Sequence, residues 1–571
     1  MKATLVVILT LFLFFTVVHA QETNSKAQTA GAVQRQKAFE LLESLATQLT
    51  TLQSAENRAR IGANIADSLW THDEKRARAL FISIEDDINW GLRVRENITA
   101  RDDYATVVFM QLRTDTVARI AKRDAELALD FLRATAPTYD NPPPAVVERE
   151  RAFEVELATQ IVASNPDLAL KLGRQSLSRR FSDDLLPLLK QLHKKRREHG
   201  VTLYKETVRK LRDADLVSDR RIVNFVRSLA EYVTPPLADE PAFRELITFL
   251  VSEALNNRCG KPNEVDDAGY FCSQVRSLVP QMQKSDPLQA AQLKHLAPDN
   301  NAWSHEMIGS PYAELQQALD TGDLDEAVAL TRKYPDMAGT IIWQVVMKAQ
   351  SDGDIESARK IANEFDGDPE VRRRLLADLD EREGSSALTD EQLAEAQTEI
   401  NQMTRTEDRI NLTVLLANRI AAKRRPAALK LLDQATEILE TQKPGKYRTG
   451  GQLVLALMYC AEKSDRGLAM MESLLPKLNE LIDAGAKLDS FDTHYMRDGE
   501  WNMSADGALG EILTYLAQNA KYFAWCDFDR AVSLAAQFER NEIRIMAQLK
   551  LAQGILAGPP KHFQLSRGVV Y

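Results

Sequence analysis

Apolar residues recur along almost the whole chain at the three- and four-residue spacing of an α-helix. The first clear stripe consists of Ala38, Leu41, Leu42 and Leu45. Residues at this spacing share one face of a helix, and that face is stable in water only when a neighbouring element covers it. The pattern continues with few interruptions to residue 557. It therefore predicts a chain that is almost entirely α-helical.

Several of the expected helices begin with a similar short sequence pattern. An Asp or a Pro begins the helix, and a small or aliphatic pair follows near its fourth and fifth positions. These openings are at Asp73, Asp124, Pro166, Pro426, Asp465 and Asp527. Repetition at intervals of about 30 to 70 residues is typical of stacked helical hairpins. We therefore expect an all-α array of antiparallel helical hairpins, an α-solenoid that is either open and curved or closed into a ring.

The clearest hairpins are expected between Leu315 and Phe365, where one unit occurs twice. In each copy an apolar-striped segment ends at a Gly-Asp pair, first Gly322-Asp323 and then Gly353-Asp354, and a second striped segment follows at once. Glycine tolerates the left-handed backbone that closes a helix, and the Asp caps the next helix. Glu326 lies three residues after the first Asp, which predicts a capping box.

Residues 315–365 resemble the tetratricopeptide family of helical repeats, in the Gly-Asp turn and in the Ala four residues after each Asp, Ala327 and Ala358. The spacing of 31 residues between Gly322 and Gly353 is shorter than that family's usual repeat. The bulky aromatic residue that the family carries in its first helix is not at a matching position. The resemblance implies a helical-repeat fold and a habit of binding proteins, and it names no particular partner.

The N-terminus has the pattern of a cleavable secretory signal. Lys2 precedes an apolar run over residues 5–18, and Val18-His19-Ala20 ends it. The run is short for a membrane span, and small residues precede the expected cut. We predict cleavage after Ala20, with an uncleaved anchor as the alternative. The mature chain would then have no transmembrane segment and would lie in the periplasm or outside the cell.

The remaining chain divides by composition. Two proline- or glycine-rich breaks separate the helical stretches, one within residues 256–310 and one between residues 383 and 389, where Thr389 and Gln392 predict a capping box. The expected parts are a polar leader at 21–35, a helical array at 36–255, an irregular connection with two cysteines at 256–310, the repeat-like hairpins at 311–383, a second array at 389–557 and a non-helical tail at 558–571.

Composition narrows the class of function. The chain has 571 residues, of which 44% are hydrophobic and 27% charged, as in an ordinary folded protein. Its net charge of −10 argues against a general nucleic-acid binder. No nucleotide-binding, nucleophile-elbow or metalloprotease motif occurs, so we expect no cofactor and no metal.

Four cysteines in an exported chain favour oxidation. Cys259 and Cys272 flank a turn-rich loop, and we predict a disulfide between them; the alternative is two reduced core residues. Cys460 and Cys526 lie in apolar helical phrases and are expected to be core positions. No spacing of cysteines and histidines indicates zinc.

Residues 190–212 contain nine Lys or Arg against two Glu. A solvated helix face explains such a stretch, and so does an interaction with a polyanion or an acidic partner. The sequence leaves both interpretations open.

The most chemically mixed stretch is 483–506, which we expect to be a loop between two long helices. Loops on a rigid scaffold often carry binding residues. The candidate acids and bases are Asp492, His494, Asp498 and Glu500, and the candidate binding residues are Tyr495, Arg497 and Trp501. The alternative is a long connection packed over the array.

The sequence therefore favours an exported, non-enzymatic helical-repeat protein that binds an unknown protein partner and acts as a scaffold. The alternative is a secreted carbohydrate-active enzyme, a hydrolase or lyase, built on a ring of helices with its site near the 483–506 loop. Six Trp residues are few for a carbohydrate cleft, which favours the scaffold.

Overall fold

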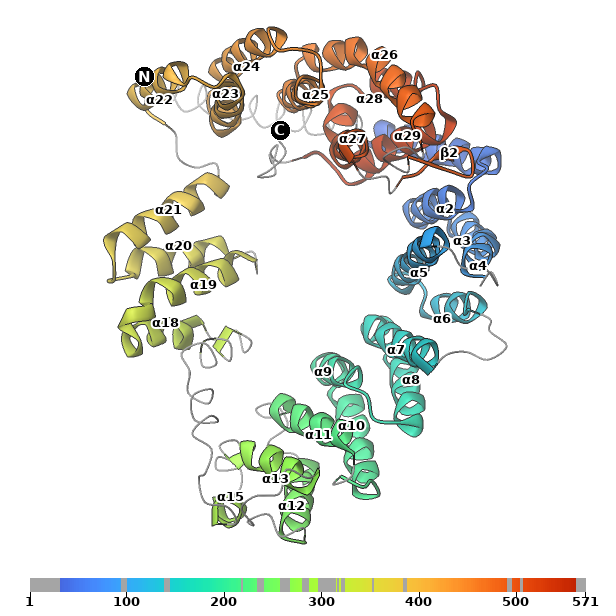
Figure 1. Cartoon of the computed structure of the whole chain (residues 1–571), viewed down its shortest axis with the longest axis vertical. Helices are drawn as coiled ribbons and strands as arrows, with labels where there is room; N and C mark the ends of the chain where they lie inside the picture. Colours follow the sequence, from blue (N-terminus) through green and yellow to red (C-terminus); the bar gives the residue numbers. More distant parts are fainter. Residues whose placement is uncertain are drawn as a thin grey trace, which may run out of the picture. The chain divides into compact units, whose positions relative to one another are not determined.

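The computed structural model describes residues 31–93, 100–137, 144–216, 219–233, 241–256, 267–279, 287–295, 315, 318–319, 324–351, 354–383, 388–489, 495–503 and 507–560. Almost all of these residues are helical, so the predicted all-α array of hairpins is confirmed (Figure 1). The chain forms two compact units, residues 46–300 and residues 1–45 together with 301–571. No helix among the described residues is long and apolar enough to cross a membrane.

The unit of residues 46–300 is a succession of helices in which neighbours along the chain pack together, as in α2 with α3, α5 with α6, α7 with α8 and α9 with α10. Its elements are η1 (Leu49–Thr51), α2 (Ala55–Leu69), α3 (Glu74–Ser83), α4 (Glu85–Leu92), α5 (Ala100–Ala121), α6 (Ala125–Ala134), α7 (Pro144–Ile161), α8 (Pro166–Arg179), α9 (Leu185–Lys195), α10 (Arg197–Arg212), α11 (Arg220–Val233), α12 (Pro241–Asn256), α13 (Asp267–Ser277) and α15 (Pro287–His295).

The other unit follows the same plan and adds one small sheet. Its elements after residue 301 are α18 (Leu324–Lys333), η2 (Pro335–Met337), α19 (Ala338–Ser351), α20 (Ile355–Glu364), α21 (Pro369–Glu383), α22 (Asp390–Gln402), α23 (Thr406–Ala421), α24 (Arg425–Glu440), α25 (Lys446–Ala461), α26 (Arg466–Lys487), β1 (Met496–Arg497), β2 (Glu500–Trp501), α27 (Gly507–Cys526), α28 (Phe528–Ala535) and α29 (Asn541–Leu556).

The first helical stretch among the described residues covers residues 31–48. It begins before Gln36, so the helical part starts earlier than the sequence pattern predicts, and the predicted polar leader lies mostly outside the described residues. Lys37 of this helix places its Nζ 2.6 Å from Oδ2 of Asp529 in α28. The N-terminal helix thus packs with the C-terminal helices of its own unit.

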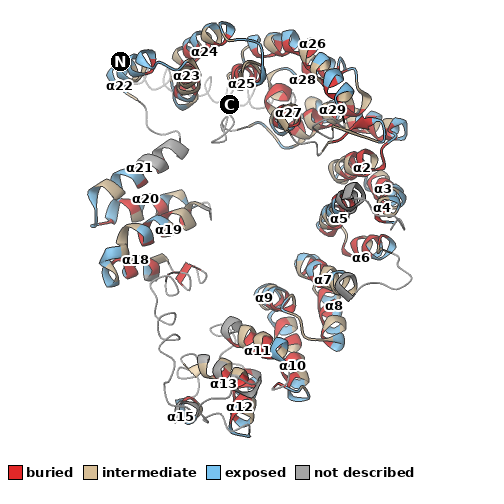
Figure 2. Cartoon of the chain, viewed as in Figure 1, coloured by how far each residue is buried: buried red, intermediate tan, exposed pale blue. Residues whose placement is uncertain are grey.

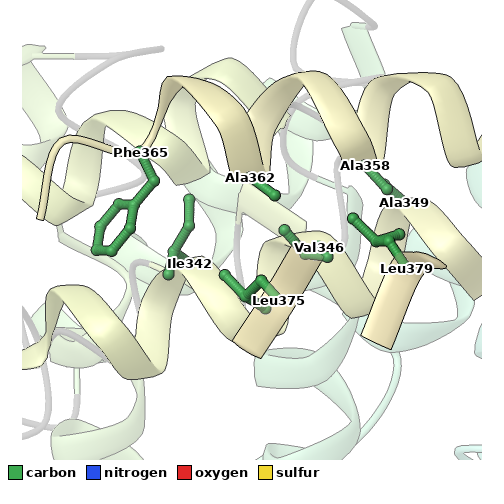
Figure 3. Close-up of a cluster of buried hydrophobic side chains, with 8 residues drawn as sticks. All are labelled: Ile342, Val346, Ala349, Ala358, Ala362, Phe365, Leu375 and Leu379. Atoms are coloured by element: carbon green, nitrogen blue, oxygen red, sulfur yellow. The ribbon is translucent and has the colours of Figure 1, made fainter. Parts of the chain in front are cut away.

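Helices are buried on the sides that face their neighbours and exposed on the others (Figure 2). The hairpins around residues 315–365 show why the helices can bury these sides only when hairpins stack on one another. One cluster of buried side chains comes from α19, α20, α21 and the residue that follows α20, and all eight point into the space between these helices (Figure 3). The cluster consists of Ile342, Val346, Ala349, Ala358, Ala362, Phe365, Leu375 and Leu379.

A second cluster lies on the other side of α19 and includes Leu315, Ala327 and Ile341. Leu324, Val328 and Ile361 pack against both clusters. Each hairpin therefore completes its core only with residues of the next one, which is the nearest-neighbour architecture of helical repeats.

Most of the predicted helix caps are present. The side chains of Asp73, Asp354 and Asp527 each accept a hydrogen bond from a backbone N–H in the first turn of the following helix. Thr389 and Gln392 form the predicted capping box, with reciprocal hydrogen bonds of 3.0 and 3.2 Å. Asp323 lies outside the described residues, so the capping box with Glu326 stays a prediction.

Asp465 differs from this pattern. It precedes α26, but its side chain makes no capping hydrogen bond, because its backbone is already helical. The predicted helix start at Asp465 is confirmed, although the side chain does not cap the helix.

Asp124 caps α6 and gives a pH-dependent prediction. Its Oδ1 accepts hydrogen bonds of 2.9 Å from the N–H groups of Glu126 and Leu127, and its Oδ2 lies 2.5 Å from Nη2 of Arg78. Burial raises the pKa of this carboxyl, but the hydrogen bonds from Leu127 and Arg78 outweigh it and hold the pKa below its ordinary 3.8. We expect Asp124→Ala to lower the local stability of α6 by about 1 kcal/mol at pH 7.

The sign of the pH dependence follows from the lowered pKa. The stabilisation is complete above the ordinary pKa and is lost as the pH falls through the lower, folded-state value. The difference between wild type and Asp124→Ala in amide hydrogen exchange of α6 should therefore shrink below about pH 4. Asn165 caps α8 with a neutral side chain, so the effect of Asn165→Ala should not change with pH. Equal pH trends for the two variants would contradict this explanation.

Candidate functional site

The helix α26 continues to Lys487, so the prediction of a loop from residue 483 is wrong for its first five residues. The rest of the predicted loop contains a short β-hairpin. β1 and β2 pair antiparallel, with Met496 opposite Trp501 and Arg497 opposite Glu500. The turn between them is Asp498-Gly499, and both residues have positive φ, 50° and 79°. Such a turn matches the twist of paired strands, which is why Asp-Gly is common in tight hairpins.

The hairpin is held by contacts on both sides of its strands. Tyr495 and Trp501 stack with their ring centroids 4.9 Å apart and their planes at 17°. The N–H of Trp501 donates to Oε1 of Glu542 in α29 at 2.7 Å. Before β1, the N–H of Met496 donates to Oδ1 of Asp489 at 2.9 Å. The segment is therefore part of the packed structure.

Trp501 is only 2% exposed. A Cβ added to Gly485 of α26 would lie 3.4 Å from ring atoms of both Trp501 and Tyr495, so the two rings pack closely on that helix. The indole is covered, and it offers no open face on which a sugar or another flat ligand could stack.

The candidate acids and bases do not converge within the described residues. Asp498 is exposed at the tip of the hairpin, whereas Glu500 is buried beside it in β2. Asp492 and His494 lie outside the described residues. Arg497 is half-buried opposite Glu500. No group of described residues is arranged to hold a metal ion, and a catalytic role for these side chains stays a prediction.

The basic stretch 190–212 covers the end of α9 and all of α10. Nε2 of His199 lies 2.8 Å from Oδ1 of Asp167, and Nη2 of Arg212 lies 3.2 Å from Oε2 of Glu245. These pairs join α10 to α8 and α12 within one unit. Some of the basic side chains in this stretch thus pair with acidic side chains of neighbouring hairpins.

Lys210 is also turned inward. Its Nζ donates to the carbonyl oxygen of Leu177 and lies 5.2 Å from the ring centroid of Phe181. Burial lowers the pKa of this amine. The exposed cations of the stretch are Lys190, Lys194, Lys195, Arg196, Arg197, Lys205, Arg209 and Arg212. Those at the end of α9 interact favourably with the helix dipole, and an acidic partner for them stays a prediction.

The four cysteines fall into two groups. Cys272 is in a disulfide, but Cys259 lies outside the described residues, so their predicted pairing stays a prediction. Cys460 and Cys526 are free thiols. They come from α25 and α27, and their side chains are hydrogen-bonded to each other. The sequence predicts them only as separate core positions, because nothing in it shows that these two helices are neighbours.

Trp343 is a surface feature that the sequence analysis missed. It lies on α19 and is 42% exposed. The side of the same helix that faces the core includes Ile342, Val345 and Val346, which are fully buried. The helical period of the sequence could have predicted that Trp343 is exposed, because this residue lies between two pairs of apolar residues that form the buried face of the helix.

Comparison with known proteins identifies no family. No family model matches the sequence, and no curated protein matches it. One chain of a structure described as "Homology model of the full-length AP-3 complex in an intermediate open conformation" aligns with 92% of this chain and 93% of its own length, at 13% identity and a TM-score of 0.18. A similarity at this level supports no functional conclusion.

Proposed function

We propose that the chain is an exported, non-enzymatic helical-repeat protein that serves as a protein-interaction scaffold in the periplasm or outside the cell. Stacked hairpins that share their cores offer long surfaces relative to their volume, and proteins of this architecture commonly use such surfaces to bind partners. The shared packing of Leu324, Val328 and Ile361 supports this architecture.

The observation that carries the proposal is the exposure of Trp343. Tryptophan is enriched among the few residues that dominate binding energy at protein interfaces. Met347 lies one turn further along the same face of α19 and is half-buried. A tryptophan beside a methionine on a rigid helix is the composition of an interface core, where both residue types are enriched.

Trp343→Ala should weaken partner binding without unfolding the hairpin. Truncation of an interface anchor costs about 2 kcal/mol or more, which is roughly a thirtyfold loss of affinity. The measurement is quantitative mass spectrometry of proteins that co-purify with the tagged full-length chain from native extract. Leu415→Ala is the matched control, since Leu415 is also 42% exposed but lies on α23. Unchanged recovery with Trp343→Ala, or an equal loss with both variants, would count against the proposal.

Export rests on the N-terminal pattern, which lies outside the described residues. We expect the chain isolated from its native cells to begin at Gln21, and Ala20→Arg to block cleavage because the signal peptidase site requires a small residue. Intact-mass measurement of the tagged protein distinguishes the two forms. A full-length chain with an intact Met1 in a cytosolic fraction would rule out a cleaved signal.

We do not propose that the chain is a carbohydrate-active enzyme. That activity depends on an open aromatic platform beside paired carboxyl groups. Trp501 is covered, and Asp498 and Glu500 differ in exposure. No observation among the described residues favours the enzyme over the scaffold.

A further inference from the structure

Cys460 and Cys526 lie in contact although 65 residues separate them in the chain. Cys460 is in the last turn of α25, and Cys526 is the last residue of α27. These two helices pack against each other. The thiols therefore meet where the ends of two helices from different hairpins come together.

Residues that follow α25 lie close to both sulfur atoms. Sγ of Cys526 lies 3.7 Å from the carbonyl oxygen of Ser464, to which the thiol donates. Sγ of Cys460 would lie only 2.5 Å from a Cβ added to Gly467. The turn thus contacts the thiol of Cys526, and Gly467 in the first turn of α26 leaves room for the thiol of Cys460 because it has no side chain.

The two thiols differ in their access to solvent. Cys460 is 2% exposed, whereas Cys526 is only half-buried. A dissolved reagent therefore reaches Cys526 first. Cys460 lies behind it, in the position of a second thiol that can react only with its neighbour.

From this geometry we infer that Cys460 and Cys526 form a reversible disulfide, which joins the end of α25 to the end of α27 when a small-molecule disulfide is available as oxidant. Reactive cysteine pairs consist of an accessible attacking thiol and a resolving thiol within reach. The inference depends on this pair alone and is independent of the proposed scaffold function.

The charges around the pair assign the two roles. The hydrogen bond with Cys460 lowers the pKa of the Cys526 thiol, against the effects of burial and of nearby Asp465 and Asp527. The same hydrogen bond, together with burial, raises the pKa of Cys460. Cys526 is thus the thiol that ionises first, and the thiolate is the nucleophile in disulfide exchange.

The exchange proceeds in two balanced steps. The Cys526 thiolate attacks one sulfur of the small disulfide, forming a mixed disulfide and releasing one small thiolate. Cys460 then loses its proton to solvent, and its sulfur attacks Sγ of Cys526 and releases the second small thiolate. The protein loses two electrons and two protons, and the small disulfide gains both and becomes two thiols. Once Cys526 is in the mixed disulfide, its negative charge no longer opposes the ionisation of Cys460.

The disulfide has a structural consequence at the corner that follows Cys526. Asp527, the next residue, caps α28 by accepting a 3.1 Å hydrogen bond from the N–H of Arg530. A bond between Cys526 and Cys460 therefore anchors the start of α28 to the end of α25. Oxidation and reduction would switch this corner between a covalent and a non-covalent attachment.

The test is to equilibrate the folded full-length chain with oxidised glutathione, block remaining thiols with N-ethylmaleimide, and map the peptides by mass spectrometry. We expect the peptides of Cys460 and Cys526 to become linked, with a loss of the masses of two hydrogens. Peptide mapping separates this bond from the disulfide of Cys272. Cys460→Ala should instead hold glutathione on Cys526, and Cys526→Ser should leave Cys460 unmodified.

Two results would overturn the inference. One is a wild-type chain in which Cys526 keeps glutathione and no linked peptide forms. The other is a wild-type chain in which both thiols remain free under the oxidant. If either variant fails to fold, as judged by circular dichroism, the wild-type peptide map alone decides.

Discussion

Gly467→Ala is expected to destabilise the α25–α26 hairpin by about 3 kcal/mol, at the upper end of the usual cost of overpacking. The new methyl carbon would lie 2.5 Å from the carbonyl oxygen of Ala456, 2.5 Å from Sγ of Cys460 and 2.7 Å from the backbone nitrogen of Cys460. Two of these three atoms belong to the backbone, so a side-chain rotation cannot relieve the clash. Amide hydrogen exchange of α25 and α26 measures the loss as a local opening free energy.

Gly339→Ala is the matched control, because Gly339 is the second residue of α19, as Gly467 is of α26. Its added Cβ would make only ordinary contacts, the nearest at 3.4 Å from Val371. Replacing glycine by alanine in a helix without a clash stabilises it by roughly 0.5–1 kcal/mol. The two substitutions should therefore have opposite signs. A similar loss at both positions would mean that the close approach of α25 and α26 is not what Gly467 provides.

Arg113→Ala should destabilise the junction of α5, α6 and α7 by about 3 kcal/mol. The Arg113 side chain is 1% exposed. Its Nη atoms donate to both carboxylate oxygens of Glu150 at 2.7 Å, and the guanidinium also donates to Oγ1 of Thr135 at 3.0 Å and to the carbonyl oxygen of Leu132 at 2.7 Å. Removing it leaves all three partners without this donor. Glu150 is still 23% exposed. We therefore expect a loss of stability at the lower end of the range that is typical when one partner of a buried ion pair is removed.

Two further variants distinguish the stability contributed by the buried ion pair from that of an ordinary surface ion pair. Arg174 makes a similar two-pronged contact with Glu206, but both side chains are far more exposed than Arg113. Arg174→Ala should cost less than about 1 kcal/mol. The double variant Arg113→Met/Glu150→Leu should regain most of the lost stability, because it leaves no buried charge. Hydrogen exchange of α5 to α7 compares these variants, and equal losses for Arg113→Ala and Arg174→Ala would contradict the assignment.

The sequence predicts the hairpins because their signals are local. A capping box needs only Thr389 and Gln392, and the cap of α20 needs only Asp354 and the N–H three residues later. The apolar stripes are local in the same way, since each follows from the period of a single helix. The small sheet has a local signal too, the Asp498-Gly499 turn, but its two-residue strands are too short to show an alternating pattern.

The functional residues are harder to predict because they depend on neighbours that are distant in the chain. Trp501 resembles a ligand platform in a polar loop, and only its contacts with Gly485 and Glu542 show that it is buried. Arg113 lies on the same helical face as Phe109 and Ile120, which signals burial but not its partner. Pairing it with Glu150 requires the packing of α5 on α7. The thiol pair at the ends of α25 and α27 is a similar case.

Site-specific photo-crosslinking from position 343 is the most direct test of the scaffold function. Trp343 would be replaced by p-benzoylphenylalanine in the full-length chain, and the native cells would be irradiated. The scaffold proposal predicts a discrete covalent adduct with another protein at this position, and much less of it when the same group is placed at Leu415. Failure to form any adduct at position 343, or equal adducts at both positions, would contradict a specific protein-binding surface on α19.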